Sequence, residues 1–175
     1  MKFKKLKYLK IIIYLISSGY AYSIDPPDIK NLIIHKKMKK IENVEIFNFK
    51  GQKISLNYYN SNITIINFWA TWCAPCKEEM PLLDKLKSNN KLKNVEIIPI
   101  NIAEETYKKS KEFFESLNIN NLEIFSGSSS GLVKKFQIRG IPTTILIDKN
   151  GYEFARIIGY IDFENKDFLD WLINY

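Results

Sequence analysis

The hydrophobic and polar positions of this chain change period several times, and each period predicts a type of element. On both sides of Gly51-Gln52, residues 44–49 and 53–56 alternate apolar with polar side chains, which is the pattern of a β-hairpin. The nearly continuous apolar runs at 63–69 and 95–100 are rich in β-branched residues, as expected of strands buried on both faces. These four segments therefore predict one hairpin and two strands in the middle of a sheet.

Apolar residues at helical spacing occupy much of the remaining chain. The spacing predicts helices over residues 75–91, 105–117, 132–136 and 163–173. Two further strands, 143–148 and 152–158, flank the tight turn Lys149-Asn150-Gly151 and are expected to pair antiparallel. Because strands alternate with helices and a hairpin comes late in the chain, we predict an α/β fold with a central mixed β-sheet, flanking helices and an N-terminal β-hairpin.

Residues 22–40, ahead of the hairpin, are predicted to form a helical extension. The rigid segment at 25–28, Asp-Pro-Pro-Asp, suits the start of a helix. Apolar residues then recur at helical spacing among several lysines, namely Ile29, Leu32, Ile33 and Met38. His35 lies in this stretch, and because no second ligand type is near it in sequence, we expect a solvated helix residue rather than a metal ligand.

The beginning of the chain has the composition of a targeting segment. The first ten residues contain five lysines and no acid, and residues 11–24 carry no charge. An uncharged run shorter than the ~20 residues that span a bilayer is typical of a signal-peptide core. Small residues suit cleavage after Ala21 or after Ser23, and an uncleaved anchor is the remaining alternative. We expect residues 1–21 to be a signal peptide or membrane anchor that directs export.

Composition and charge narrow the functional classes. The chain has 175 residues, 46% of them apolar and 26% charged, which is ordinary for one globular domain, here residues 41–175. Most of the net charge of +7 lies in the leader, and removal of residues 1–21 leaves about +2, so nucleic acid is not an expected partner. Two cysteines and one histidine are too few for a disulfide framework or an ordinary four-ligand zinc site.

Both cysteines lie in the segment Trp72-Cys73-Ala74-Pro75-Cys76-Lys77, after a predicted buried strand and at the start of a predicted helix. Unpaired backbone N–H groups and the positive end of the helix dipole favour the thiolate form of Cys73 at that position. Pro75 suits the first helical turn, and the spacing puts both sulfurs on one face of it. Such a pair can attack a disulfide of a partner and then resolve the mixed disulfide that forms.

Three other interpretations of the cysteine pair use fewer of these features. A zinc site lacks its remaining ligands. A purely structural disulfide that closes so short a loop adds little stability. Two unreactive core thiols do not require a proline between them or a place at the start of a helix. Dithiol redox chemistry is therefore the interpretation that the segment favours.

The segment 67–81, NFWATWCAPCKEEMP, resembles the active site of the thioredoxin superfamily, and specifically of its exported TlpA/ResA-type branch. Residues 140–144, GIPTT, are similar to the cis-proline loop of that family, and residues 147–151 to its last hairpin. The similarity extends from about residue 44 to the C-terminus. It implies a thioredoxin-like fold, a monomer in the periplasm or at the outer face of the cytoplasmic membrane, and no cofactor besides the redox-active Cys73–Cys76 pair.

The resemblance also implies roles for individual residues. Cys73 would be the exposed nucleophile and Cys76 the buried resolving thiol. The substrate-binding residues would be Trp72, Ala74, Pro75, Ile141 and Pro142, with Pro142 preceded by a cis peptide bond.

Glu79 stands where ResA-like proteins carry a functional acid, one helical turn after Cys76. There it would have a raised pKa and take up the proton of Cys76, whereas the position by itself also suits a solvated surface acid. Asn67 replaces the buried aspartate of cytoplasmic thioredoxins and cannot titrate. We expect Trp69 mainly in the core and Trp72 at the rim of the site.

Three functions are compatible with such a site. The first is an exported reductant of client cysteine pairs in cytochrome c or cytochrome oxidase biogenesis, re-reduced by a membrane thiol carrier. The second is a disulfide oxidant or isomerase, although oxidants of the superfamily usually carry a histidine where this chain has Ala74-Pro75. The third is a copper-handling binding protein, since two thiolates bind Cu(I), but only Met80 accompanies them. Cytochrome c maturation reductases often have Pro-Glu where this chain has Pro142-Thr143, which favours oxidase or copper-site assembly within the first function.

Overall fold

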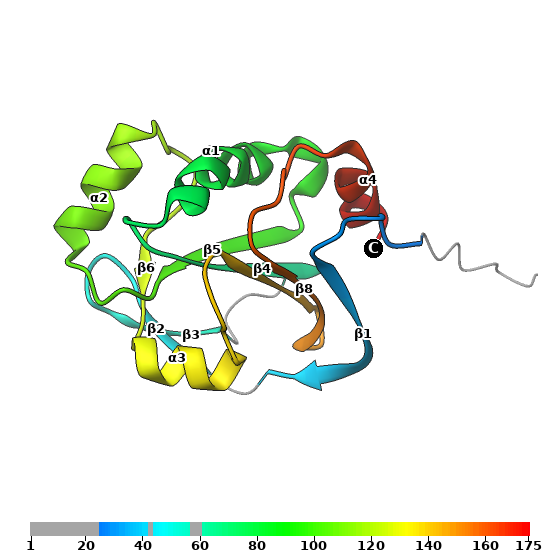
Figure 1. Cartoon of the computed structure of the whole chain (residues 1–175), viewed down its shortest axis with the longest axis horizontal. Coiled ribbons are helices and arrows are strands. Elements are labelled where there is room, and N and C mark those ends of the chain that lie inside the picture. Colours follow the sequence, from blue (N-terminus) through cyan, green and yellow to red (C-terminus); the bar gives the residue numbers. More distant parts are fainter. Residues whose placement is uncertain (1–24, 42–43, 57–60) are drawn as a thin grey trace, which may run out of the picture.

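Eight strands form one mixed β-sheet with helices on both faces, in a computed structural model that describes residues 25–41, 44–56 and 61–175 (Figure 1). The strands follow one another across the sheet in the order β1-β8-β7-β4-β5-β6-β2-β3. The signal peptide or anchor expected at residues 1–21 lies outside the described residues. Within the described ranges, no helix combines the length and the apolar character needed to cross a membrane.

The middle of the sheet forms as predicted. β4 (Ile63–Trp69) and β5 (Val95–Asn101) lie side by side and parallel, and β7 (Thr143–Asp148) and β8 (Tyr152–Ile158) continue the sheet antiparallel. Every residue of β4 is buried, because this strand has neighbours on both sides and helices above and below. The predicted mixed sheet is therefore confirmed.

The predicted N-terminal hairpin is confirmed at one edge of the sheet. It consists of β2 (Glu45–Phe47) and β3 (Lys53–Ser55), and β2 also pairs with the short β6 (Phe125–Ser126). The side-chain oxygen of Asn48 organises the turn, since it accepts hydrogen bonds from the N–H groups of residues 50 and 52, each at 2.9 Å. Gly51 completes the turn with a φ of +70°, which L side chains rarely adopt.

The opposite edge of the sheet contradicts one prediction. A helical extension was predicted over residues 22–40, but the described part, residues 25–40, contains no helix, and β1 (Leu32–Lys40) is a strand that pairs antiparallel with β8. The β-branched pair Ile33-Ile34 favours a strand, and the free edge of β8 supplies hydrogen-bond partners that a local pattern cannot reveal. Exposed lysines along β1 are typical of an edge strand, where charge opposes pairing with other chains. The segment therefore belongs to the sheet of the domain.

Among the described residues, three α-helices cover one face of the sheet and one covers the other. α1 (Ala74–Ser88), α2 (Tyr107–Ser116) and α4 (Lys166–Asn174) pack on the first face, and α3 (Ser129–Phe136) packs on the second (Figure 1). A 3₁₀ turn, Asn90–Leu92, follows α1. The predicted helices are confirmed, with their ends displaced by a few residues.

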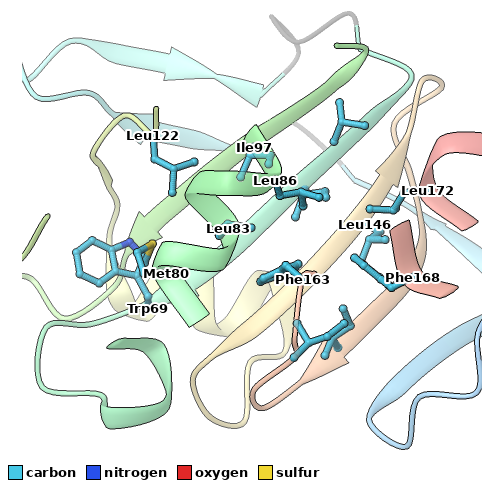
Figure 2. Close-up of a cluster of buried hydrophobic side chains, with 14 of the residues drawn as sticks. Trp69, Met80, Leu83, Leu86, Ile97, Leu122, Leu146, Phe163, Phe168 and Leu172 are labelled. Atoms are coloured by element: carbon cyan, nitrogen blue, oxygen red, sulfur yellow. The ribbon is translucent and has the colours of Figure 1, made fainter. Parts of the chain in front are cut away.

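The larger core lies between the sheet and the three-helix face. Figure 2 shows part of it, with side chains from β4, α1 and α4 that include Trp69, Met80 and Phe168. Trp69 is fully buried, as predicted, and its ring lies 4.9 Å from that of Phe113 on α2, measured between centroids. Since both β4 and α1 contribute to this core, the loop between them, residues 70–73, is held at both ends.

Candidate active site

The two cysteines lie at the junction of this loop with α1 and are joined by a disulfide. Cys73 is the N-cap residue of α1, and its sulfur accepts a hydrogen bond from the N–H of Cys76 at 3.3 Å. In the reduced protein, a donor directed at this sulfur and the positive end of the helix dipole both favour the thiolate of Cys73. The structure thus places Cys73 at the start of a helix, where the sequence predicted it.

The exposure of Cys73 differs from the prediction. Instead of an exposed nucleophile, Cys73 in the disulfide form is only 4% exposed, against 0% for Cys76. Its sulfur is bonded to that of Cys76 and faces the first turn of α1, so both side chains count among the core residues. The residues on either side of Cys73 are exposed to solvent instead. Trp72 is 69% exposed and lies at the rim of the site, as predicted, and Ala74 and Pro75 are exposed as well.

The loop before β7 lies at the same surface as the cysteine loop. The Ile141–Pro142 peptide bond is cis, as predicted, and the carbonyl of Pro142 accepts a hydrogen bond from the N–H of Gly159 at 2.8 Å. Ile141 and Trp72 line one groove of about 440 Å³, which has a largely apolar wall that includes Val133. The fold therefore brings the two loops to a common groove, although Trp72 and Ile141 lie 69 positions apart in the sequence. We call this hollow the client groove.

Glu79 lies on α1 one turn after Cys76, and its side chain is fully buried. The alternative of a solvated surface acid is therefore wrong. Burial raises the pKa of Glu79 to about 7, although hydrogen bonds from the Asn67 side chain and the Ile161 backbone act in the opposite direction. A carboxyl group with this pKa can take up or release a proton near neutral pH.

Asn67 and Thr144 connect Glu79 to the middle of the sheet. The side-chain amide of Asn67 donates to Oε1 of Glu79 at 2.7 Å and to Oγ1 of Thr144 at 3.0 Å, and all three residues are buried. Asn67 and Thr144 are cross-strand neighbours on β4 and β7, so the register of these strands positions the chain of hydrogen bonds. Sequence reasoning identified Asn67 only as a residue that does not titrate and missed Thr144, whose one signal was its closeness to Pro142.

A second carboxylate, Glu105, holds the loop before the cysteines and was also missed. It accepts hydrogen bonds from the N–H and O–H of Thr71 at 3.1 and 2.5 Å and from the side-chain amide of Asn101 at 2.8 Å. Burial raises the pKa of Glu105, but the hydrogen bonds from Lys109, Thr71 and Asn101 outweigh burial and lower it to about 2. Glu105 follows β5, whose carboxyl end adjoins that of parallel β4, and this adjacency was the signal available in the sequence.

His35 also differs from the prediction of a solvated helix residue. It lies on β1 with its side chain 24% exposed, and its Nε2 is 2.7 Å from the fully buried Glu153 on β8. In residues 25–41, 44–56 and 61–175, no group of three or more His, Cys, Asp or Glu side chains is arranged to hold a metal ion.

The sequence model of the AhpC/TSA family matches residues 35–152, which is most of the chain. The chain belongs to the AhpC/TSA family. Its curated relatives include thiol-disulfide oxidoreductases named ResA from two strains of Bacillus cereus. One is 28% identical over 159 residues, 91% of each chain, and the other is 32% identical over 121 residues, 69% of each chain.

Solved structures support the fold of this AhpC/TSA-family chain. A DsbF homologue from Corynebacterium diphtheriae superimposes with a TM-score of 0.67 at 19% identity, over 87% of this chain and 98% of that one. Together with the curated relatives, this likeness confirms the predicted thioredoxin-like α/β fold and the resemblance to ResA-type proteins. The predicted class of enzyme, a thiol:disulfide oxidoreductase with a Cys73–Cys76 pair, is confirmed as well.

Proposed function

We propose that this protein is an exported reductant that passes electrons to cysteine pairs of client proteins during cytochrome oxidase or cytochrome c biogenesis. The observation that carries the proposal is the Cys73–Cys76 pair at the start of α1, one helical turn from the buried carboxyl group of Glu79, whose pKa burial raises to about 7. The lysine-rich leader with its uncharged core supports export. The relatives named ResA support the assignment to the TlpA/ResA-type branch of the thioredoxin superfamily. Ala74-Pro75 between the cysteines, without a histidine, favours a reductant over an oxidant.

The proposed reaction begins with both cysteines reduced. The thiolate of Cys73 attacks one sulfur of the client disulfide, which forms a mixed disulfide and releases the other client sulfur as a thiolate. The thiolate of Cys76 then attacks the sulfur of Cys73, closes the Cys73–Cys76 disulfide and releases the second client sulfur. Two electrons pass to the client, whose two sulfurs each take up a proton. A membrane thiol carrier would return two electrons to the enzyme.

Glu79 is the proposed acceptor of the Cys76 proton before the second step. The two residues are buried on the same side of α1, one turn apart, and Asn67 fixes the carboxylate through the 2.7 Å hydrogen bond. A free thiol has a pKa of about 8.5, and burial in apolar surroundings raises it further. A base with a pKa of about 7 is therefore better matched to this thiol than an ordinary glutamate, whose pKa is 4.5.

Cysteine variants test the order of attack. Cys73→Ser is expected to abolish reduction of client disulfides, because the attacking sulfur is lost. Cys76→Ser is expected to leave the attack intact and to accumulate mixed disulfides, whose client can be identified by mass spectrometry after purification under non-reducing conditions. The double variant is the control and should trap no client. Accumulation of mixed disulfides in Cys73→Ser instead of Cys76→Ser would reverse the assignment, and trapped clients without any cytochrome-biogenesis protein would contradict the proposed pathway.

The reduction potential of the Cys73–Cys76 pair tests the direction of electron flow. A reductant should have a potential near that of thioredoxin, about −270 mV, when equilibrated with glutathione or dithiothreitol buffers. A potential near about −120 mV, as in strong periplasmic oxidants, would contradict the proposal and support the oxidant alternative.

A further inference from the structure

A second hollow lies where the edge strand β1 and its neighbour β8 meet the chain that follows α3. It encloses about 410 Å³. Most of its lining side chains are basic, and they come from three separate segments: His35, Lys37, Lys39, Arg139 and Arg156. The lining also includes two apolar side chains, Ile33 and Ile158, which are 43% and 42% exposed. We call this hollow the basic pocket.

The positive charge of the basic pocket is only partly neutralised. Its acidic lining residue, Glu153, is fully buried and is already shared, since Oε1 lies 2.6 Å from the Arg156 guanidinium and 2.7 Å from His35. Lys39 donates to a backbone carbonyl at 3.3 Å. Among the described residues, no carboxylate forms an ion pair with Lys37, Lys39 or Arg139. Cations gathered in a hollow raise the local concentration of anions, so an anionic occupant is favoured there.

Arg139 connects the basic pocket to the active site. It lines both the basic pocket and the client groove, and Gly140 and the cis-proline loop follow it directly in the chain. The two hollows therefore adjoin. A client whose disulfide lies over Cys73 and whose flanking residues follow the client groove would place its next residues in the basic pocket.

We propose that the basic pocket binds an acidic segment of the client that flanks its cysteine pair. This inference rests on the proposed function, because it takes the client disulfide to be bound at the client groove. Carboxylates of the segment would pair with Lys37, Lys39 and Arg139, and apolar residues between them would contact the exposed isoleucines of the pocket. Such a contact selects clients by sequence and speeds their encounter with the dithiol.

A client segment suits the basic pocket better than an anionic membrane does. Lipid headgroups form an extended surface, which meets protruding or flat basic faces, whereas these cations line a hollow. The hollow also shares Arg139 with the client groove, so an occupant that continues from that groove requires no second binding event.

The test compares two synthetic peptides, each with one internal disulfide, reduced by the full chain with Cys73 and Cys76 in the thiol form. One peptide carries Asp and Glu on one side of its cysteines, and the other carries Asn and Gln at the same positions. At low salt, kcat/KM is expected to be about tenfold higher for the acidic peptide, since each exposed ion pair contributes a few-fold in affinity. The preference should decrease as salt is added.

A double variant assigns this preference to the basic pocket. Lys37→Gln/Lys39→Gln is expected to reduce the ratio of the two kcat/KM values to about one. Lys91→Gln/Lys93→Gln is the matched control, because it removes the same charge from exposed lysines outside the lining, and it should keep the ratio. Equal rates for both peptides with the unmodified chain, or the same loss of preference in both double variants, would overturn the proposal.

Two further measurements separate this proposal from its alternatives. If neither peptide is reduced, the proposed function fails, and the pocket is then tested by titrating an acidic peptide in which serine replaces both cysteines. Binding that Lys37→Gln/Lys39→Gln weakens about tenfold supports the pocket, and absence of binding overturns it. Vesicles with anionic headgroups test the alternative that the basic pocket binds a membrane. If Lys37→Gln/Lys39→Gln loses vesicle binding but keeps the preference for the acidic peptide, the pocket binds a membrane and the proposal is wrong.

Discussion

The buried carboxyl group of Glu79 should make the stability of the oxidised protein depend on pH, and Glu79→Gln should remove that dependence. The pKa of Glu79 is about 7 in the folded protein, whereas the ordinary value of 4.5 applies to the unfolded chain. Between these values the folded state holds a proton that the unfolded state has lost. The contribution of Glu79 to stability is therefore fully present below pH 4.5 and is lost as the pH rises to about 7.

The size of this effect follows from the difference between the two pKa values. Each pKa unit corresponds to about 1.4 kcal/mol, so the unfolding free energy should fall by about 3 kcal/mol between pH 4.5 and pH 8. Gln has the size of Glu and does not ionise. The oxygen Oδ1 of Asn67 is buried without a hydrogen-bond partner among the described residues, so rotation of that amide offers an acceptor to the Gln side chain. Glu79→Gln should therefore be about 3 kcal/mol more stable than the wild type at pH 8 and similar to it at pH 5.

Urea unfolding at a series of pH values between 5 and 8.5 measures this difference. The Cys73–Cys76 disulfide is kept intact so that no thiol titrates in the same range. Glu78→Gln is the matched control, because Glu78 is the preceding residue on α1 but is exposed to solvent, and its stability curve should run parallel to that of the wild type. Parallel curves for Glu79→Gln and the wild type would show that Glu79 titrates like an ordinary carboxyl group, and its proposed role as a base would lose its support.

Three further predictions concern the site and the core. In reduced Glu79→Gln, the apparent pKa of the resolving step should rise, as followed by stopped-flow decay of a mixed disulfide with a fluorescent peptide; an unchanged pH profile would contradict the proposed base. Glu105→Gln should lower the unfolding free energy at pH 7 by about 2 kcal/mol, because hydrogen bonds to a charged group are lost from the loop before the cysteines. Its acid unfolding should also lack the loss of stability that the wild type shows as the pH falls from 4.5 toward 2, and an identical acid transition would refute this account. Phe168→Ala should cost about 4 kcal/mol in urea unfolding, since this ring is fully buried, whereas Phe49→Ala, at a ring 48% exposed, should cost less than about 1 kcal/mol.

Local sequence patterns were sufficient to predict the secondary structure wherever the rest of the fold favoured the same element. The apolar run at 63–69 could only be a strand buried on both faces, and the turn at 149–151 sets the register of the hairpin that it closes. The cysteine motif was equally informative, because its chemistry depends on a strand before it and a helix after it, both of which are contiguous in sequence. The helical interpretation failed for residues 32–40, because the edge of β8, more than 110 residues away in the chain, pairs with them as a strand.

The sequence by itself determined the dithiol, its place at the start of a helix and the mixed sheet around it, since each depends on residues that are near one another in the chain. Only the tertiary structure decided that Glu79 is buried against Asn67, because this requires α1 to pack on the sheet with that side inward. The same holds for Glu105 on Thr71 and for the cations of the basic pocket, which come from β1, β8 and the loop after α3. Contacts of that kind depend on strand order and packing, and those are properties of the whole folded chain.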